Sequence, residues 1–180
     1  TIAIGTPTNE MRECFTYVLK GHVALATAAF PVGTTGSQLD SLARQPLWDA
    51  GLDFDHGTGH GIGSFLSVHE GPQRIFKSSD HKDEFLKAGM IISNEPGYYK
   101  PNKYGIRIEN LVVVKKVKNG KLGFDTISWA PIDKELILID LLNTVEKKWL
   151  NDYHKRIYKN LHRYLSTKEK LWLKKVTRPL

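Results

Sequence analysis

Alternating glycines between residues 56 and 72 constrain the fold more than any other feature of the chain. The segment reads HGTGHGIGSFLSVHEGP and holds three of the chain's seven histidines and five of its fifteen glycines. Glycine is unfavourable inside a helix, but in an extended segment it lets another backbone or a ligand approach closely. The pattern therefore predicts a glycine-lined strand or loop, in which a ligand or a second strand lies against the backbone.

The histidines of this segment need separate roles if the segment is extended. His56 and His60 stand four residues apart, a spacing that brings two imidazoles to one metal ion only on a helix. In an extended chain the same spacing corresponds to about 13 Å, from roughly 3.3 Å per residue. We therefore expect that the two do not share a metal ion. A single histidine is also commonly an ordinary core or surface residue, so the glycines alone leave the roles open.

Two glutamates on apolar segments narrow the possible roles of the histidines. Glu95 ends an apolar run and precedes Pro96, which favours an extended backbone at Glu95. Glu109 lies in the run GIRIENLVVV at 105–114, which is apolar enough to predict a central strand. A buried carboxylate there needs compensation. Two compensators remain open: Arg107 on the same face, or a divalent cation shared by both glutamates and one histidine.

The ligand types predict which metal such a site would hold. Carboxylate oxygens with one imidazole favour manganese, or cobalt or zinc by availability, over a structural zinc site built from thiolates. The single cysteine, Cys14, lies among apolar residues at helical spacing and is predicted to be a packed thiol.

The remaining chain predicts a mixture of helices and strands, an α/β (α+β) protein. Short connections between the predicted strands after residue 90 favour an antiparallel sheet. The polar stretch 77–84 is predicted to be an exposed loop. The predicted helices are 8–30, 37–51 and 140–165, and the predicted strands are 1–5, 90–95, 105–117 and 123–129.

Composition argues against a membrane-spanning protein, and the uneven distribution of charge weakens the alternative of a protein that binds nucleic acids or acidic membranes. The chain has 180 residues, of which 41% are hydrophobic and 25% charged, and it lacks an apolar run of the roughly 20 residues that a membrane span needs. Its net charge is +7, and much of the excess follows residue 145. The predicted helix at 140–165 could dock on acidic partners, but a solvated basic face is the favoured interpretation.

Three motifs in this order, GTGHGIGSFLSVHEGP, NEPGYY and GIRIEN, resemble the metallopeptidases of the pita-bread fold, in particular the Xaa-Pro aminopeptidase (aminopeptidase P) branch. The stretches 129–133 and 149–154 resemble the C-terminal extension of that branch. The resemblance covers residues 1–165. It implies a mostly antiparallel sheet with flanking helices, incomplete at its N-terminal side, with residues 1–133 in the peptidase domain and 134–180 in a helical extension.

The resemblance also implies a role for each candidate site residue. His69 would bind the scissile carbonyl and stabilise the oxyanion, and His56 would help form the pocket for the substrate proline. Glu95 would also carry a proton to the leaving nitrogen. Arg107 would be a partner of the carboxylates, and Tyr99 a hydrogen-bonding group near the substrate. The implied metal ligands are His60, Glu95 and Glu109.

In this family the resemblance implies two divalent ions, most often manganese, held by five ligands that include two upstream aspartates eleven positions apart. None of the ten aspartates in this chain stands eleven positions from another. We therefore expect the natural protein to be longer, and this fragment to have an empty or partly occupied site and little activity alone. The alternative is a catalytically dead relative.

The implied substrates are peptides with proline in second position, and the implied enzyme is a cytoplasmic homodimer. A different class also remains open, a metal-free pita-bread module that binds peptides or proteins.

Overall fold

The computed structural model describes residues 1–65, 67–77 and 83–180. Residues 1–16 and 129–180 form one compact unit, and residues 17–128 form a second. The domain boundary predicted at residues 133/134 stays a prediction. Most of the predicted loop at 77–84 lies outside the described residues. Among the helices of the described part, none is long and apolar enough to cross a membrane.

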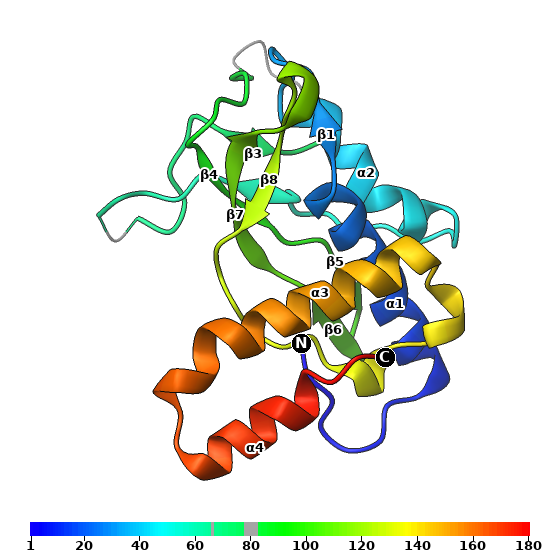
Figure 1. Ribbon diagram of the computed structural model, residues 1–180. Helices are drawn as coiled ribbons and strands as arrows, with labels where there is room; N and C mark the ends of the chain where they lie inside the picture. Colours follow the sequence, from blue (N-terminus) through cyan, green and yellow to red (C-terminus); the bar gives the residue numbers. More distant parts are fainter. Residues whose placement is uncertain (66, 78–82) are drawn as a thin grey trace. The chain divides into compact units, whose positions relative to one another are not determined.

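A four-stranded antiparallel sheet organises the unit of residues 17–128, in the strand order β1-β8-β7-β4 (Figure 1). The antiparallel pairing predicted from the short connections is therefore confirmed. Two antiparallel strand pairs accompany the sheet, β2 with β3 and β5 with β6. The strands are β1 (Ala29–Phe30), β2 (Gly59–His60), β3 (Arg74–Ile75), β4 (Ile91–Asn94), β5 (Gly97–Lys100), β6 (Tyr104–Arg107), β7 (Asn110–Lys116) and β8 (Leu122–Thr126).

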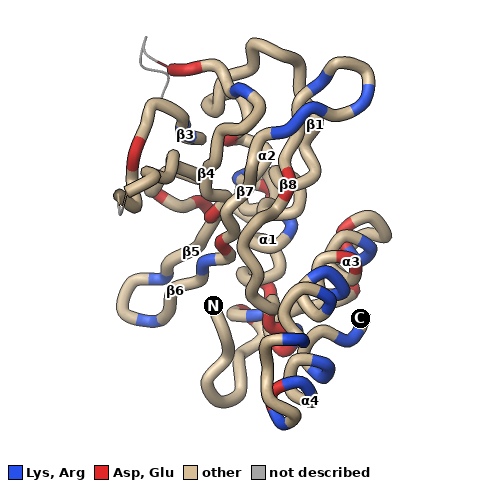
Figure 2. Tube along the Cα trace, turned by 60° about the vertical axis from the view of Figure 1, so that its left-hand side comes forward, with Lys and Arg blue, Asp and Glu red and all other residues tan. Residues whose placement is uncertain are grey.

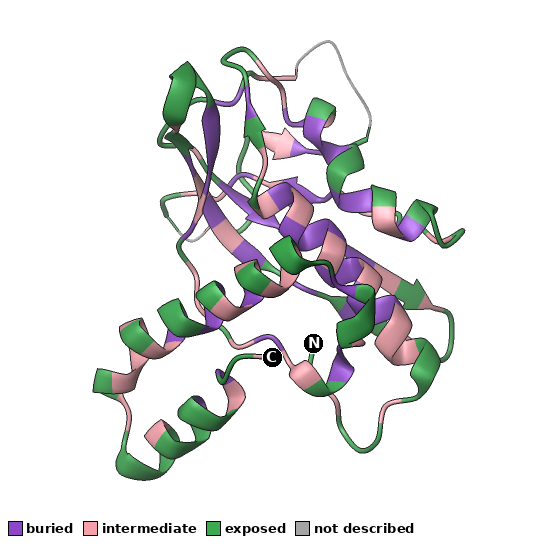
Figure 3. Cartoon of the chain, turned by 45° about the vertical axis from the view of Figure 1, so that its right-hand side comes forward, coloured by how far each residue is buried: buried purple, intermediate pink, exposed green. Residues whose placement is uncertain are grey.

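Alternation along β7 builds the core of this unit. Val112 and Val114 are both buried in a cluster with residues of β4, β8 and the helix α2 (Ser37–Trp48). Side chains two apart on a strand point to the same face, so β7 presents one apolar face to this cluster. Figure 3 shows the buried residues concentrated along these strands and on one side of α2. The sheet therefore gives a rigid base on which β4 and β7 carry the candidate site.

The other unit is largely helical. It contains α3 (Thr144–Leu161) and α4 (Thr167–Val176), and each begins with a capping box, made by Asn143 and Glu146 and by Ser166 and Glu169. Figure 2 shows Lys and Arg positions spread along the traces of α3 and α4, as expected of solvated helix faces. The helix α1 (Asn9–Ala26) contains the boundary between the two units, and Cys14 on it is buried, as predicted. The 3₁₀ turns are η1 (Lys118–Gly120), η2 (Lys134–Leu136), η3 (Ile139–Leu141) and η4 (His162–Tyr164).

Several predicted boundaries were wrong, each for a local reason. Residues 1–5 form no strand, because the Ala3 amide donates to the Asp133 carboxylate and Gly5 has a positive φ. The first helix ends at Ala26 rather than at residue 30, and the last two predicted helical residues instead pair with β8. The last long helix is α3, which is shorter than 140–165 at both ends.

The predicted strand at 105–117 is two strands, not one. Among the described strands, β6 pairs only with β5, and β7 pairs with β4 and β8, so residues 108 and 109 lie between two different sheets. The Ile108 amide donates to the carbonyl of Pro96 at 3.3 Å, which takes the chain from one sheet to the other. This break decides the surroundings of Glu109.

Candidate metal centre

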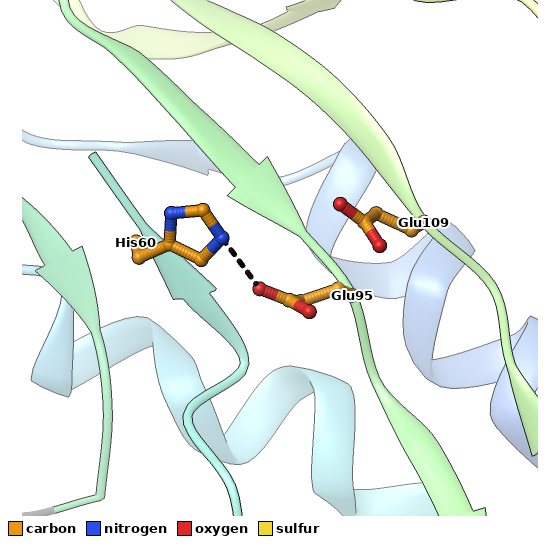
Figure 4. Close-up of side chains that lie close together, drawn as sticks. All are labelled: His60, Glu95 and Glu109. Atoms are coloured by element: carbon orange, nitrogen blue, oxygen red, sulfur yellow. Dashed lines mark ion pairs between the residues drawn. The ribbon is translucent and has the colours of Figure 1, made fainter. Parts of the chain in front are cut away.

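Three side chains from separate segments converge beside the end of β4. His60 lies on β2, Glu95 follows β4 directly, and Glu109 precedes β7. One ligand atom from each of the three lies within 4.8 Å of the others. Figure 4 shows these three side chains close together. Two ligand atoms at right angles around a cation are about 3 Å apart when each is about 2.1 Å from it. The three atoms are therefore slightly wider apart than the ligands of a bound ion, and small side-chain movements would bring them around one divalent ion.

The contacts of His60 point its Nε2 at a carboxylate. Its Nδ1 lies 3.0 Å from the carbonyl oxygen of Gly61. A carbonyl only accepts, so Nδ1 donates to it, and Nε2 lies 3.0 Å from Glu95 Oε1. A divalent cation held between Nε2 and the carboxylate would be a partner for both groups. A backbone carbonyl that fixes the outer ring nitrogen is the usual support of a metal-binding histidine.

Ser93 links two of the candidate ligands. It is fully buried on β4, its hydroxyl donates to Glu95 Oε1 at 2.9 Å, and its oxygen accepts from the His60 amide at 2.9 Å. β2 can approach β4 this closely because of Gly59, where an added Cβ would lie 2.1 Å from the Ser93 carbonyl oxygen. The glycine predicted to allow a close backbone approach does so here.

The structure corrects the predicted surroundings of Glu109. Its side chain is exposed, whereas its neighbours Ile108 and Asn110 are buried. The prediction of a carboxylate buried in a central strand was wrong, because the strand is interrupted at this point. The buried carboxylate is that of Glu95, which is only 6% exposed. Arg107 pairs with Glu95 Oε2 at 3.2 Å.

His56 lies at the end of a different hydrogen-bond chain. Arg107 Nε donates to the Tyr99 hydroxyl at 2.7 Å, and that hydroxyl lies 2.9 Å from His56 Nε2. His56 Nδ1 lies 2.8 Å from the carbonyl of Gly57, so Nδ1 donates there and Nε2 accepts from Tyr99. Burial lowers the pKa of His56, and the charge of Arg107 lowers it further. At neutral pH the imidazole is therefore neutral and has a fixed tautomer.

One cavity of about 250 Å³ joins these groups. His69 lies on its exposed rim, and its ring centroid is 4.2 Å from that of His60. The structure thus brings the three predicted histidines together, with different partners for each. Tyr99 and Glu109 are not part of the lining. The lining residues are His56, Gly57, Gly59, His60, His69, Glu95 and Arg107.

Four buried polar residues around the site were not predicted. Ser93 had a usable signal, since it stands two positions before Glu95 in the predicted strand 90–95, and residues two apart on a strand lie on the same face. The other three lie on α2 or beside it and had no local signal. They are Asp40, Arg44 and Thr58.

Comparison with known proteins identifies the family to which this chain is similar. The sequence model of "Metallopeptidase family M24" matches residues 1–116, and that of the "C-terminal region of peptidase_M24" matches residues 120–180. A probable Xaa-Pro aminopeptidase P from Coprinopsis cinerea is 50% identical over 98% of the chain, and aminopeptidase P1 from Arabidopsis thaliana is 45% identical over 100%. The chain spans only 30% and 29% of these two relatives.

Solved structures agree with the sequence relatives. The X-prolyl aminopeptidase of Caenorhabditis elegans, a cytosolic enzyme with a di-nuclear active site, superposes with a TM-score of 0.90 at 40% identity, covering 98% of this chain and 30% of that one. Prolidase from Pyrococcus furiosus gives a TM-score of 0.59 at 36% identity over 69% of this chain and 34% of its own. The predicted pita-bread fold and the resemblance to Xaa-Pro aminopeptidases are confirmed. The chain belongs to metallopeptidase family M24.

Proposed function

We propose that this chain supplies the metal-binding histidine and glutamates of a Xaa-Pro aminopeptidase, which hydrolyses the bond between an N-terminal residue and a following proline. The observation that carries the proposal is the convergence of His60, Glu95 and Glu109 beside a cavity lined by two further histidines. The relatives named above support the substrate class.

The donor set fits a divalent cation, with manganese favoured and cobalt or zinc as alternatives. His60 would offer Nε2, and Glu95 and Glu109 would offer carboxylate oxygens. Two divalent ions, when bound, lower the pKa of a water molecule and polarise the scissile carbonyl. Further ligands would come from the part of the longer protein outside this chain. We therefore expect the 180-residue chain alone to be partly occupied and inactive.

The remaining residues of the site would bind the peptide and move a proton. His69, on the rim of the cavity, would donate to the carbonyl oxygen and stabilise the charge that develops on it. Burial and the charge of Arg107 lower the pKa of His56 and keep it neutral, so its ring offers an uncharged surface to the substrate proline. Glu95 would transfer a proton to the leaving nitrogen. The proposal also includes a homodimer that is located in the cytoplasm. The cytosolic relative from Caenorhabditis elegans supports the location.

Metal content and hydrolysis of an X-Pro peptide test the proposal in the full-length protein. We expect two ions per chain. Glu109→Gln removes a metal ligand, so we expect it to bind less metal and to have a kcat/KM lower by about a hundredfold or more. Glu84→Gln is the matched control, since Glu84 pairs only with Lys87 among the contacts that the structure describes, outside the site. A full-length protein without metal that still binds peptides would instead support the metal-free module.

A further inference from the structure

We propose that Asp40 and Arg44, a buried ion pair on α2, are positioning residues that hold the backbone carrying His56 and Glu95. The kinetic part of this inference rests on the proposed function. The structural part does not.

The pair is unusual for its burial. Arg44 is 0% exposed and Asp40 is 2% exposed, and Arg44 Nε donates to Asp40 Oδ2 at 2.6 Å. A buried guanidinium is very costly unless its other donors also find acceptors. The acceptors of those other donors therefore show which part of the chain the ion pair positions.

Three further hydrogen bonds of Arg44 reach the segment that leads to His56. Nη1 donates to the carbonyl of Phe54 at 2.5 Å and to the Asp53 carboxylate at 2.8 Å. Nη2 donates to the carbonyl of His56 at 2.9 Å. The guanidinium also lies 3.9 Å above the ring of Phe54, whose centroid is 4.8 Å from the His56 ring. One side chain thus fixes the backbone on both sides of residue 55 and the ring that packs on His56.

Asp40 extends the same support to a proposed metal ligand. Its second oxygen, Oδ1, accepts from the Thr58 hydroxyl at 2.6 Å. The carbonyl of Thr58 accepts from the amide of Glu95 at 2.8 Å. The ion pair therefore contacts the His56 segment directly and the Glu95 backbone through one residue.

Space filling alone does not account for this arrangement. Apolar residues of similar volume can replace a buried ion pair with no loss of stability, so burial of the pair is weak evidence for a stability role. A planar guanidinium with several fixed donors does define the direction of the carbonyls that it binds. A displacement of about 1 Å at a catalytic group can cost about a hundredfold in rate.

Thr58 offers the gentlest test, in the full-length metal-loaded protein. Thr58→Val keeps the shape and removes the hydroxyl that reaches Asp40, whereas Thr58→Ser keeps the hydroxyl. We expect Val to lower kcat/KM for an X-Pro peptide about tenfold and Ser to stay within about threefold of the natural protein. Arg44→Lys keeps the charge but loses the planar fork and should lose about a hundredfold. Asp53→Asn is the matched control, because Asp53 is 41% exposed and its amide oxygen can still accept from Arg44.

A second measurement separates positioning from a general structural role. Nitrogen NMR of labelled histidines should show His56 with its proton on Nδ1 in the natural protein, in Thr58→Ser and in Asp53→Asn. In Thr58→Val and Arg44→Lys we expect a mixture of tautomers. Should the natural protein fail to hydrolyse X-Pro peptides, the proposed function is wrong, while the His56 signals still decide the positioning role. Unchanged His56 signals in both Thr58→Val and Arg44→Lys would overturn the inference, as would equal losses of kcat/KM in the Val and Ser variants. If Arg44→Lys does not fold, the Thr58 pair decides alone.

Discussion

Replacing Ser93 by alanine should damage both the stability of the chain and its metal affinity. The hydroxyl donates to the Glu95 carboxylate and accepts from the His60 amide, and both distances are 2.9 Å in a fully buried position. A hydrogen bond to a charged group contributes about 1.5–3 kcal/mol, and a buried amide left without a partner costs about 1–3 kcal/mol. Together these contributions predict a loss of roughly 2.5–6 kcal/mol in the free energy of unfolding.

The same substitution frees two candidate ligands to move. Loss of a supporting group behind a metal ligand usually lowers metal affinity about 10- to 100-fold. Urea unfolding of the chain without metal measures the change in stability. Calorimetric titration of the full-length protein with Mn²⁺ measures the change in affinity. The two effects have one cause, so Ser93→Ala should show both.

Ser166→Ala is the control that separates a site effect from general destabilisation. Ser166 caps α4 and accepts from the Glu169 amide, so its loss should cost about 1 kcal/mol of stability. The Mn²⁺ affinity of Ser166→Ala should equal that of the natural protein. The reasoning about Ser93 is refuted if Ser93→Ala binds Mn²⁺ within twofold of the natural affinity, or if its stability falls by less than about 1 kcal/mol.

Three further predictions follow from single contacts. Gly59→Ala places a Cβ 2.1 Å from the Ser93 carbonyl oxygen and should destabilise the chain by more than about 3 kcal/mol. The Cβ of Gly57→Ala meets a side-chain carbon at 3.1 Å, so this variant should lose clearly less stability. Thermal unfolding measures both losses. Burial lowers the pKa of His22 to about 4, so the unfolded chain binds a proton below about pH 6.5 that the folded chain does not. Stability is full above that pH and should fall by up to about 3 kcal/mol towards pH 4, with a smaller slope in His22→Gln, as urea midpoints against pH will show. Tyr99→Phe keeps the ring but removes the hydroxyl that lies between Arg107 and His56. It should lower kcat/KM about tenfold and leave the metal content unchanged, and steady-state kinetics and metal analysis measure the two.

Motif order predicted which side chains lie close together better than it predicted their environment. The extended glycine segment and the antiparallel sheet follow from local rules and are confirmed. The burial of Glu109 was wrong because apolar neighbours on both sides suggested one continuous strand. The break at residues 108 and 109 comes from pairing with two different sheets, and such pairing is a long-range property. A window of ten residues does not contain that information.

The polar support behind the site was missed for a related reason. Asp40 and Arg44 have the i, i+4 spacing of an ordinary exposed ion pair, and nothing in α2 itself shows that they are buried. Their burial depends on the segment 53–58, which folds over them. The helix α4 lies within the helical extension that the resemblance implies for residues 134–180, but its bounds were not predicted, although Ser166 and Glu169 form a capping box at its start.

Charge limits what the described ligand set can hold by itself. Glu95 and Glu109 supply two negative charges, and Arg107 already pairs with one of the two carboxylates. Two divalent ions bring four positive charges, so a second ion needs further carboxylates close by. The chain spans about 30% of its relatives, which leaves room in a longer protein for those groups. The 180-residue chain alone should therefore bind at most one Mn²⁺ with measurable affinity, and Glu109→Gln should abolish that binding. Two ions bound tightly to the chain alone, measured by metal analysis after gel filtration, would show that it already holds a complete ligand set and that the assignment of three ligands is wrong.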